Sequence, residues 1–284
     1  EEAVERALER TLVQTGVLLL PFGKAEIEPS FSYSHGEQRA PVFVSNGGSE
    51  VFIGEDKVRR DEAIAGVDLR IGLPFDAQAE FGLPYNWAHQ DTTTRVGFAD
   101  SSSDGDSGHG LGDLRIGAAK TLLRERGWLP DLVARVWWDT ATGETRDNDV
   151  VIGSGFHELG GGLSAVKRQD PLAFVGQLSY EHTLENDGIQ PGDALGFSLG
   201  MVLAASPETS LRASFSQRFR DDVEVDGRTI AGSDRTTGTL NLGASLLLGR
   251  SALLDLGVDV GVTDDAPDYV VRLSLPMRFN LPML

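Results

Sequence analysis

The feature that most constrains the fold of this chain is a two-residue alternation of apolar and polar side chains. Residues 269–279 show it clearly: every second position is Tyr, Val, Leu, Met or Phe, and the positions between them from 272 onward carry Arg, Ser or Pro. In residues 254–262, Leu and Val alternate in the same way with Asp and Gly. Successive side chains of a β-strand point to opposite faces, so this pattern predicts strands with one apolar face.

Ten further segments of roughly ten residues alternate in the same way. They cover residues 24–34, 64–73, 77–87, 111–122, 132–140, 155–167, 172–182, 194–205, 211–219 and 237–248. Short turns alternate with longer polar stretches, which we expect to be loops, at 35–60, 88–110, 141–154, 184–191, 220–235 and 263–268. The chain is therefore predicted to be all-β, a twelve-stranded antiparallel meander with its long loops at one end.

Composition alone would describe a soluble acidic protein, because 284 residues carry a net charge of −18 and no cysteine. These figures exclude a disulfide scaffold and a basic nucleic-acid binder. No apolar run approaches the ~18–20 residues of a membrane helix. A soluble sandwich also alternates, but here the polar face repeatedly carries Gly, Ser and paired charges, the strand number is even, and loop lengths are segregated. These features favour a transmembrane β-barrel.

The aromatic residues support the barrel, because they fall at two heights on the apolar face. Alternating strand directions place most of them at the long-loop end and Phe75, Trp128 and Phe279 at the other edge, as in the aromatic girdles of membrane barrels. The predicted girdle residues are Tyr33, Tyr85, Trp87, Trp138, Tyr180, Phe219 and Tyr269 at the long-loop end and Phe279 opposite. This arrangement predicts the bacterial outer membrane, with the long loops extracellular and both termini periplasmic.

The first fourteen residues differ in kind. Val4, Leu8 and Leu12 recur at helical spacing, and Gly16 provides a C-terminal stop. One interpretation is a periplasmic leader or part of a longer helical region. The other is a plug that enters the barrel, with Arg6 and Arg10 paired to lumen acids such as Glu26, Glu28 or Asp68. The predicted units are a plug helix at 1–16, a connector at 17–23, a barrel at 24–279 and a tail at 280–284.

Charged residues of both signs fall on the predicted lumen face. Their simplest role is to form salt bridges that stiffen the wall, and the alternative is to steer a polar substrate. The lumen set is Glu26, Glu28, Asp68, Arg70, Glu80, Asp113, Arg115, Arg135, Asp139, Arg212, Arg218, Asp255, Asp259 and Arg272.

The opening of the chain, residues 7–29 and the following Ser30-Phe-Ser-Tyr-Ser-His35, resembles the barrel domain of Fap-type functional amyloid secretion channels of Gram-negative bacteria. This opening is the most specific part of a similarity that extends through the barrel to Phe279. The resemblance implies a trimer of twelve-stranded barrels, each gated by a helical plug, that exports unfolded amyloid subunits to the cell surface. The partner would then be a secreted amyloid-forming polypeptide.

Other functions have weaker support in the sequence. The segment 105–110 contains Asp, Ser and His, but neighbours in a glycine-rich loop rarely form a triad, and its spacing matches no EF-hand. A lipase would need Ser and His together on the outer wall. No metal or nucleotide motif is present, so we expect no cofactor and no enzyme. The alternative to secretion is a passive uptake barrel for small hydrophobic or aromatic compounds, which predicts an apolar constriction and lateral openings.

Overall fold

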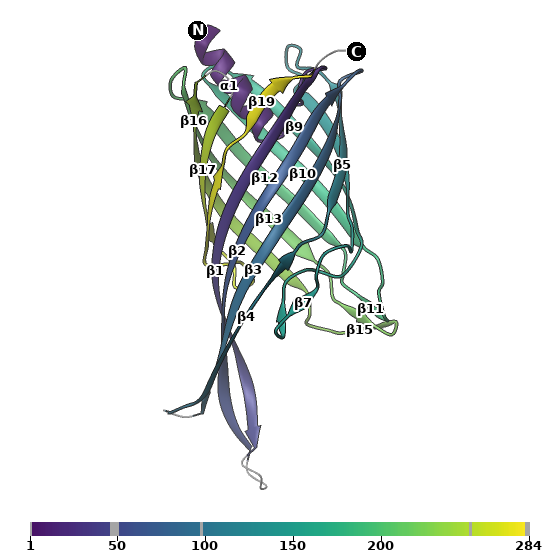
Figure 1. Cartoon of the computed structure of the whole chain (residues 1–284), viewed down its shortest axis with the longest axis vertical. Helices are drawn as coiled ribbons and strands as arrows, with labels where there is room; N and C mark the ends of the chain where they lie inside the picture. The colour runs from purple at the N-terminus through teal and green to yellow at the C-terminus, as the bar shows by residue number, and fades with distance from the viewer. Residues whose placement is uncertain (1, 46–50, 97–98, 250–251, 282–284) are drawn as a thin grey trace.

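The computed structural model describes residues 2–45, 51–96, 99–249 and 252–281. It is a β-barrel with one helix at one end (Figure 1). The helix is α1 (Glu2–Gln14), and the wall segments are β1 (Lys24–Ser45), β2 (Val51–Leu73), β3 (Ala77–Val96), β4 (Ala99–Leu111), β5 (Arg115–Leu123), β6 (Asp131–Asp139), β9 (Glu158–Gln169), β10 (Leu172–Thr183), β12 (Ala194–Ala204), β13 (Thr209–Arg220), β16 (Arg235–Leu248), β17 (Ala252–Gly261), β18 (Tyr269–Ser274) and β19 (Met277–Asn280). Two-residue strands occur in the loops: β7 (Arg146–Asp147), β8 (Val150–Val151), β11 (Ile189–Gln190), β14 (Glu224–Val225) and β15 (Arg228–Thr229).

The wall closes on itself. β1 pairs with β2 on one side and with β18 and β19 on the other, and every pairing is antiparallel. β4 and β5 both pair with β3 and form successive parts of one wall strand, as β18 and β19 do on either side of Pro276. The predicted twelve-stranded antiparallel barrel is confirmed. Closure matters in a bilayer because every backbone amide in hydrocarbon must find a partner.

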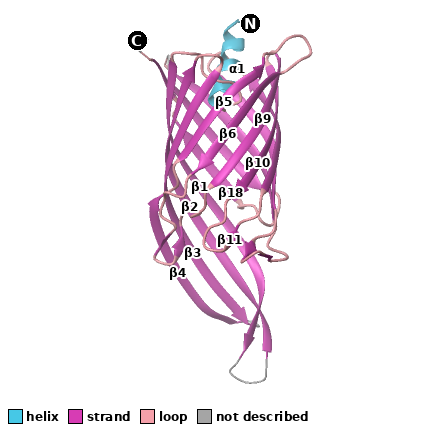
Figure 2. Cartoon of the chain, turned by 90° about the vertical axis from the view of Figure 1, so that its right-hand side faces the viewer, coloured by secondary structure: helices cyan, strands magenta, loops and turns pink. Residues whose placement is uncertain are grey.

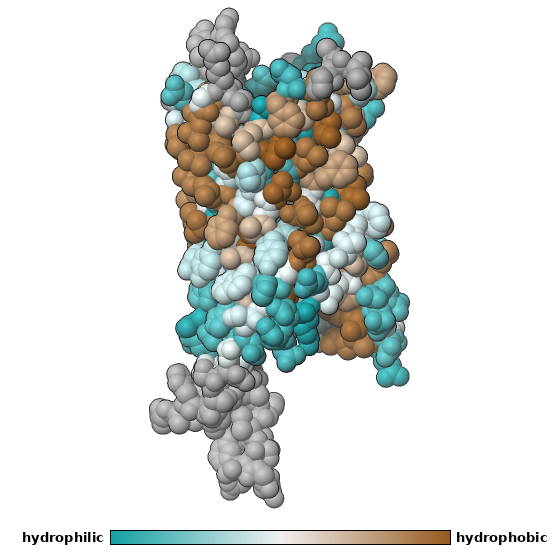
Figure 3. Space-filling view, in the orientation of Figure 1, coloured by the Kyte–Doolittle hydropathy of each residue, from teal (hydrophilic) through white to brown (hydrophobic). Residues whose placement is uncertain are grey.

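The strand registers separate an outer from an inner face. Outward apolar side chains are exposed, for example Val67 at 52% and Leu199 at 64%, whereas inward Glu26 and Gln78 are buried. Figure 3 shows hydrophobic side chains gathered in a band over the barrel wall, with hydrophilic residues toward the looped end. An apolar band of this kind matches the hydrocarbon layer of a membrane.

Four strands run far beyond the rest of the wall, which corrects one expectation. The described parts of residues 35–60 and 88–110 are strands and not loops: β1 continues to Ser45, β2 begins at Val51, and β3 pairs with β4. Residues 46–50 and 97–98 of these predicted loops lie outside the described residues. Figure 2 shows this extension below the barrel. Outside the bilayer a strand pair needs no lipid-facing apolar row, so hydropathy does not reveal it.

Both ends of the described chain lie at the end of the barrel opposite the extension (Figure 1). We call this the helix end, because α1 lies there, and the opposite end the extended end. Among the described residues, no helix is both long enough and apolar enough to cross a membrane.

Candidate functional site

The helix α1 sits in the lumen at the helix end and is held by an apolar contact. Leu8 and Leu12 are 1% and 0% exposed. They belong to one buried cluster with a further helix residue, a connector residue and four wall residues, namely Ala7, Val17, Val166, Ala173, Val202 and Ala204. The wall members are the inward residues of β9, β10 and β12, so the usual polar lumen face is apolar where the helix packs.

Two lumen arginines bind the end of the helix that points into the barrel. Arg70 donates to the carbonyl oxygens of Val13 and Gln14, at 3.2 and 2.9 Å, and Arg135 donates to the carbonyl of Gly16 at 2.7 Å. The last carbonyls of a helix lack intrahelical partners and carry the negative end of its dipole. The guanidinium groups satisfy these carbonyls and complement their charge.

The connector that follows the helix lies tightly against the wall. Gly16 has φ of +75°, which lets the chain turn directly after the helix. Farther along, the backbone of Leu20 donates to the buried side chain of Gln78 at 2.8 Å. A methyl group added to Gly72 would lie 2.2 Å from the carbonyl oxygen of Pro21, so the chain passes directly over a residue that has no side chain.

The predicted partners of the helix arginines are wrong for Arg10. Arg10 donates to the carbonyl of Pro207 in the β12–β13 turn. Glu26 instead pairs with Arg70 at 2.7 Å and with Arg278, both of which lie directly across from it on neighbouring strands. Cross-strand neighbours are already held at contact distance by the ladder, which favours them over a helix residue. The side chains of Val4 and Arg6 lie outside the described residues.

Arginines and acids pair across the inner wall. Most of the predicted lumen charges take part, which supports the wall-stiffening interpretation. The pairs are Arg70 with Glu28, Arg115 with Asp139, Arg135 with Glu80, Arg212 with Asp255, Arg218 with Glu181 and Arg272 with Asp259. Asp68 lies across from Glu28 on the same face and lines the cavity at the end of the helix.

Asp113 is an exception to the predicted lumen set. It lies between β4 and β5, where the ladder is interrupted, and not on a strand. Its carboxylate accepts from the backbone of Gly143 at 2.9 Å and from the hydroxyl of Ser154 at 3.1 Å. Asp113 therefore holds the loop that follows β6 and forms no wall pair with an arginine among the described contacts.

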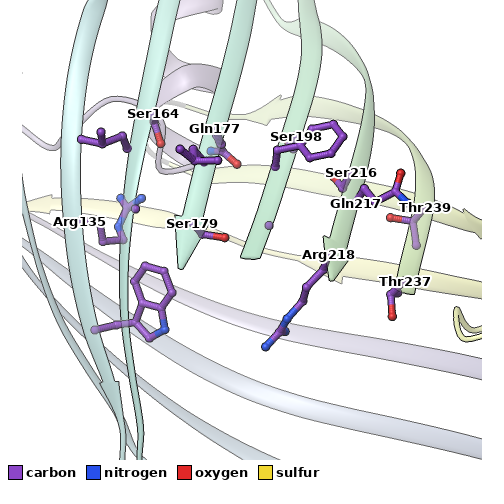
Figure 4. Close-up of a pocket in the computed structure, with 16 residues that line it drawn as sticks. Arg135, Ser164, Gln177, Ser179, Ser198, Ser216, Gln217, Arg218, Thr237 and Thr239 are labelled. Carbon is purple, nitrogen blue, oxygen red and sulfur yellow. The ribbon is translucent and has the colours of Figure 1, made fainter. Parts of the chain in front are cut away.

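Beyond the helix, cavities lie between the described residues of the lumen. One of about 420 Å³ lies at the end of the helix against Arg70 and Arg135, and one of about 270 Å³ lies between Val17 and Arg212. The third, of about 310 Å³, lies farther along the wall (Figure 4). Most of its lining side chains are polar, and they include Arg135 and Arg218. The uptake alternative predicts an apolar constriction, whereas many of the residues that line these cavities are polar or charged.

The predicted girdle residues all project from the outer face. At the extended side, Tyr33 and Tyr269 place their ring centroids 6.3 Å apart across β1 and β18. Their outward neighbours in the set are Tyr85, Trp87, Trp138, Tyr180 and Phe219, exposed by 39–52%. Phe279 projects from β19 at the helix end, near the exposed turn residues Phe75 and Trp128.

Sequence reasoning missed the histidines of this girdle. All five lie beside outward aromatic residues, and three follow one two positions along a strand: Tyr33-Ser-His35, Trp87-Ala-His89 and Tyr180-Glu-His182. Two of them share an aspartate with the preceding tyrosine, since Asp61 binds Tyr33 and His35, and Asp193 binds Tyr180 and His182. The repeated spacing is the signal that could have revealed them. The remaining contacts are His109 with Tyr85 and His157 with Trp138.

The motif at 105–110 is a strand and not the flexible loop that we expected. It lies in β4, where Asp106 and Ser107 point to opposite faces. Ser107 hydrogen-bonds to His89 on β3 at 2.8 Å, and the backbone of His109 donates to Asp147. The three residues of the motif therefore do not form a triad with one another. Within the described ranges, no group of three His, Cys, Asp or Glu side chains could hold a metal ion.

The barrel is similar to solved outer-membrane structures. An outer-membrane channel from Pseudomonas putida F1 matches with a TM-score of 0.70 and 17% identity, over 93% of this chain and 98% of that one. The translocator domain of the autotransporter NalP from Neisseria meningitidis matches with a TM-score of 0.50 and 14% identity, over 98% and 97%. The toluene transporter TbuX from Ralstonia pickettii gives 0.45 and 9%, over 92% and 90%. At these identities the first two likenesses show a shared fold.

A family match corrects the interpretation drawn from residues 7–35. The sequence model of a family described by phenol degradation, and not by amyloid secretion, matches residues 31–279. The Fap-type resemblance is therefore wrong, and so are amyloid export and an amyloid-forming polypeptide as partner. The trimer was implied only by that resemblance and has no other support. The chain belongs to the family described as "Putative MetA-pathway of phenol degradation".

Proposed function

We propose that this protein is a passive outer-membrane channel for the uptake of small aromatic compounds. The observation that carries the proposal is the family match over residues 31–279, which covers almost the whole barrel and connects it with phenol degradation. The fold is that of outer-membrane channels, and the lumen contains cavities large enough for small molecules. A transport role, without chemistry on the substrate, suits this arrangement.

The orientation that fits the proposal places the helix end in the periplasm. Outer-membrane barrels have short periplasmic turns and longer extracellular loops. Here the short turns, such as residues 206–209 between β12 and β13, lie at the end that holds α1. The long β1–β4 extension would then stand on the cell surface, and the lumen cavities would be approached from outside.

The helix is the gate in this proposal. Its hydrophobic face fills the periplasmic end through Leu8 and Leu12, and its last carbonyls bind Arg70 and Arg135. The pairing of lumen charges also matters, because guanidinium and carboxylate groups that bind each other hold fewer water molecules that a neutral solute must displace. This is how a polar lumen can serve aromatic compounds without an apolar constriction.

Uptake by intact cells tests the function, because a phospholipid vesicle lacks the lipopolysaccharide leaflet that phenol must cross. We expect a strain without the gene to take up labelled phenol more slowly than its parent at limiting concentration, and a plasmid copy to restore the rate. Equal rates in all three strains would contradict the proposal. Glycerol uptake in the same strains is the control for general permeability.

A further inference from the structure

Trp137 is unusual among the aromatic residues of the wall because it faces the lumen. Alternation along β6 places Trp138 and Val136 outward and Trp137 inward with Arg135. The indole lies flat on β9: a methyl group added to Gly160 would be 2.0 Å from the ring, and one on Gly162 would be 3.5 Å from it. One face of the indole is therefore covered by a glycine backbone.

Part of Trp137 borders open space. The residue lines both the 310 Å³ cavity and the 420 Å³ cavity at the end of the helix, so it stands where the two meet. Aromatic rings bind one another in offset or edge-to-face arrangements. A planar solute that moves through the lumen toward the helix passes this indole, which is fixed in place by the strand behind it.

The wall around the ring is polar but mainly uncharged. Figure 4 shows Ser164, Gln177, Ser179, Ser198, Ser216 and Thr239 around the 310 Å³ cavity. Hydroxyl and amide groups both donate and accept hydrogen bonds. They suit a solute that carries a hydroxyl group, and they offer no full charge to an ionised one.

The two arginines of this cavity are already engaged. Arg135 binds Glu80 at 2.9 Å and the carbonyl of Gly16 at 2.7 Å, and Arg218 binds Glu181. A carboxylate ligand beside these arginines would meet the acids that already pair with them. A neutral ligand avoids this cost.

We propose that Trp137 and this wall form a binding subsite for a neutral hydroxylated monoaromatic compound, with phenol as its simplest form. The inference rests on the proposed function and specifies its substrate class. The ring of the ligand stacks on the exposed part of the indole, and its hydroxyl bonds to the Ser, Thr and Gln side chains. Aromatic acids and saturated alcohols each lack one of these two features.

Calorimetric titration of the purified full-length protein in detergent micelles tests the subsite, with micelles alone as the blank. We expect phenol to bind at least about tenfold more tightly than benzoate or cyclohexanol, and Trp137→Ala to weaken phenol binding about tenfold. The matched control is Trp138→Ala on the opposite face of the same strand, which should leave binding unchanged. Gly160→Ala keeps the indole but displaces it, so it should weaken binding by a smaller factor.

Loss of binding counts only for variants that retain the heat-dependent gel mobility of a folded barrel, and Trp137→Phe provides a second test if the alanine variant fails. Phenylalanine keeps a ring, so we expect it to retain most of the affinity. Equal affinity for phenol and benzoate, or equal losses in Trp137→Ala and Trp138→Ala, would overturn the subsite. Cellular phenol uptake that depends on the gene but not on Trp137 would reject the subsite and leave the channel standing.

Discussion

The two halves of the lumen are built from the same strands but differ in what they hold. At the helix end, inward positions are small and apolar, such as Val166, Ala173 and Val202, and they enclose Leu8 and Leu12. Toward the extended end, the inward positions of the same strands are Gly162, Gln177 and Ser198, and they surround open cavities. The same wall thus provides an apolar contact surface for the helix at one end and polar cavities toward the other. The boundary between these two halves lies where Arg70 and Arg135 bind the end of the helix.

The largest expected effect on gating comes from disrupting the apolar contact between the helix and the wall. Leu12→Asp would place a charge at a fully buried position, which costs more than the ~2–5 kcal/mol of a buried Leu→Ala change. We expect the helix to leave the lumen and the open probability of single channels in planar bilayers to rise at least about 30-fold. Glu9→Gln, at an exposed helix position, is the control, and a closed channel in both variants would contradict a gating role for α1.

The second largest effect is expected where the arginines bind the end of the helix, at the boundary between the two halves of the lumen. Arg70→Gln removes the donor to Val13 and Gln14 and leaves Glu26 with one arginine fewer. Hydrogen bonds to charged groups contribute about 1.5–3 kcal/mol, so we expect open probability to rise about tenfold. Arg115→Gln breaks a wall pair with Asp139 and should have little effect on gating. Equal effects of the two changes would show that wall charge in general, and not the helix contact, controls the gate.

A smaller effect is expected from a substitution that displaces the connector from the wall. In Gly72→Ala the new methyl group would meet the backbone of Pro21, and overpacking of this kind costs about 1–3 kcal/mol. We expect faster proteolysis of the N-terminal segment in reconstituted protein. Gly66→Ala on the same face of β2 meets only the side-chain oxygen of Ser30, so it is the matched control. Identical proteolysis of the two variants would exclude a fixed connector.

The smallest effect concerns the ion pairs that Glu125, in the β5–β6 turn at the helix end, forms with Lys167 and Arg168. Burial opposes ionisation of Glu125, but hydrogen bonds from Lys167 and Arg168 outweigh it and lower the pKa of this carboxyl. A lowered folded-state pKa stabilises the protein above the pKa of the unfolded chain, and this contribution disappears as pH falls through the folded value. Glu125→Gln should therefore lower the unfolding temperature slightly at pH 7 and progressively less in acid, whereas a pH-independent difference would contradict the assignment.

Much of the barrel follows from the sequence, because period-two alternation is a direct consequence of a wall with lipid on one side. The twelve strands and the outward Tyr and Trp residues are visible in that pattern, and the helical spacing of Leu8 and Leu12 reveals the helix. The extension of β1 to β4 is not visible in the alternation, since paired strands in water need no apolar row. Alternation places Trp137 on the inner face, but the contact with Gly160 joins two strands and has no local signal.

The functional error has a similar cause. Residues 7–35 describe a helix, a connector and a first strand, which any barrel with an N-terminal plug could share. The family match depends instead on residues 31–279, the wall and its loops. A short opening segment therefore identified an architecture, and the long remainder identified the family. The predicted partners of Arg10 failed for a related reason, because strand register decides which charges meet.

The most direct test of the account is the initial rate of labelled phenol uptake by intact cells that carry the wild-type gene, no gene, or the Leu12→Asp variant. A channel for small aromatic compounds closed by its helix predicts the lowest rate without the gene, an intermediate rate with the wild type and the highest rate with the variant. Equal rates in the three strains, at equal amounts of folded barrel, would contradict it.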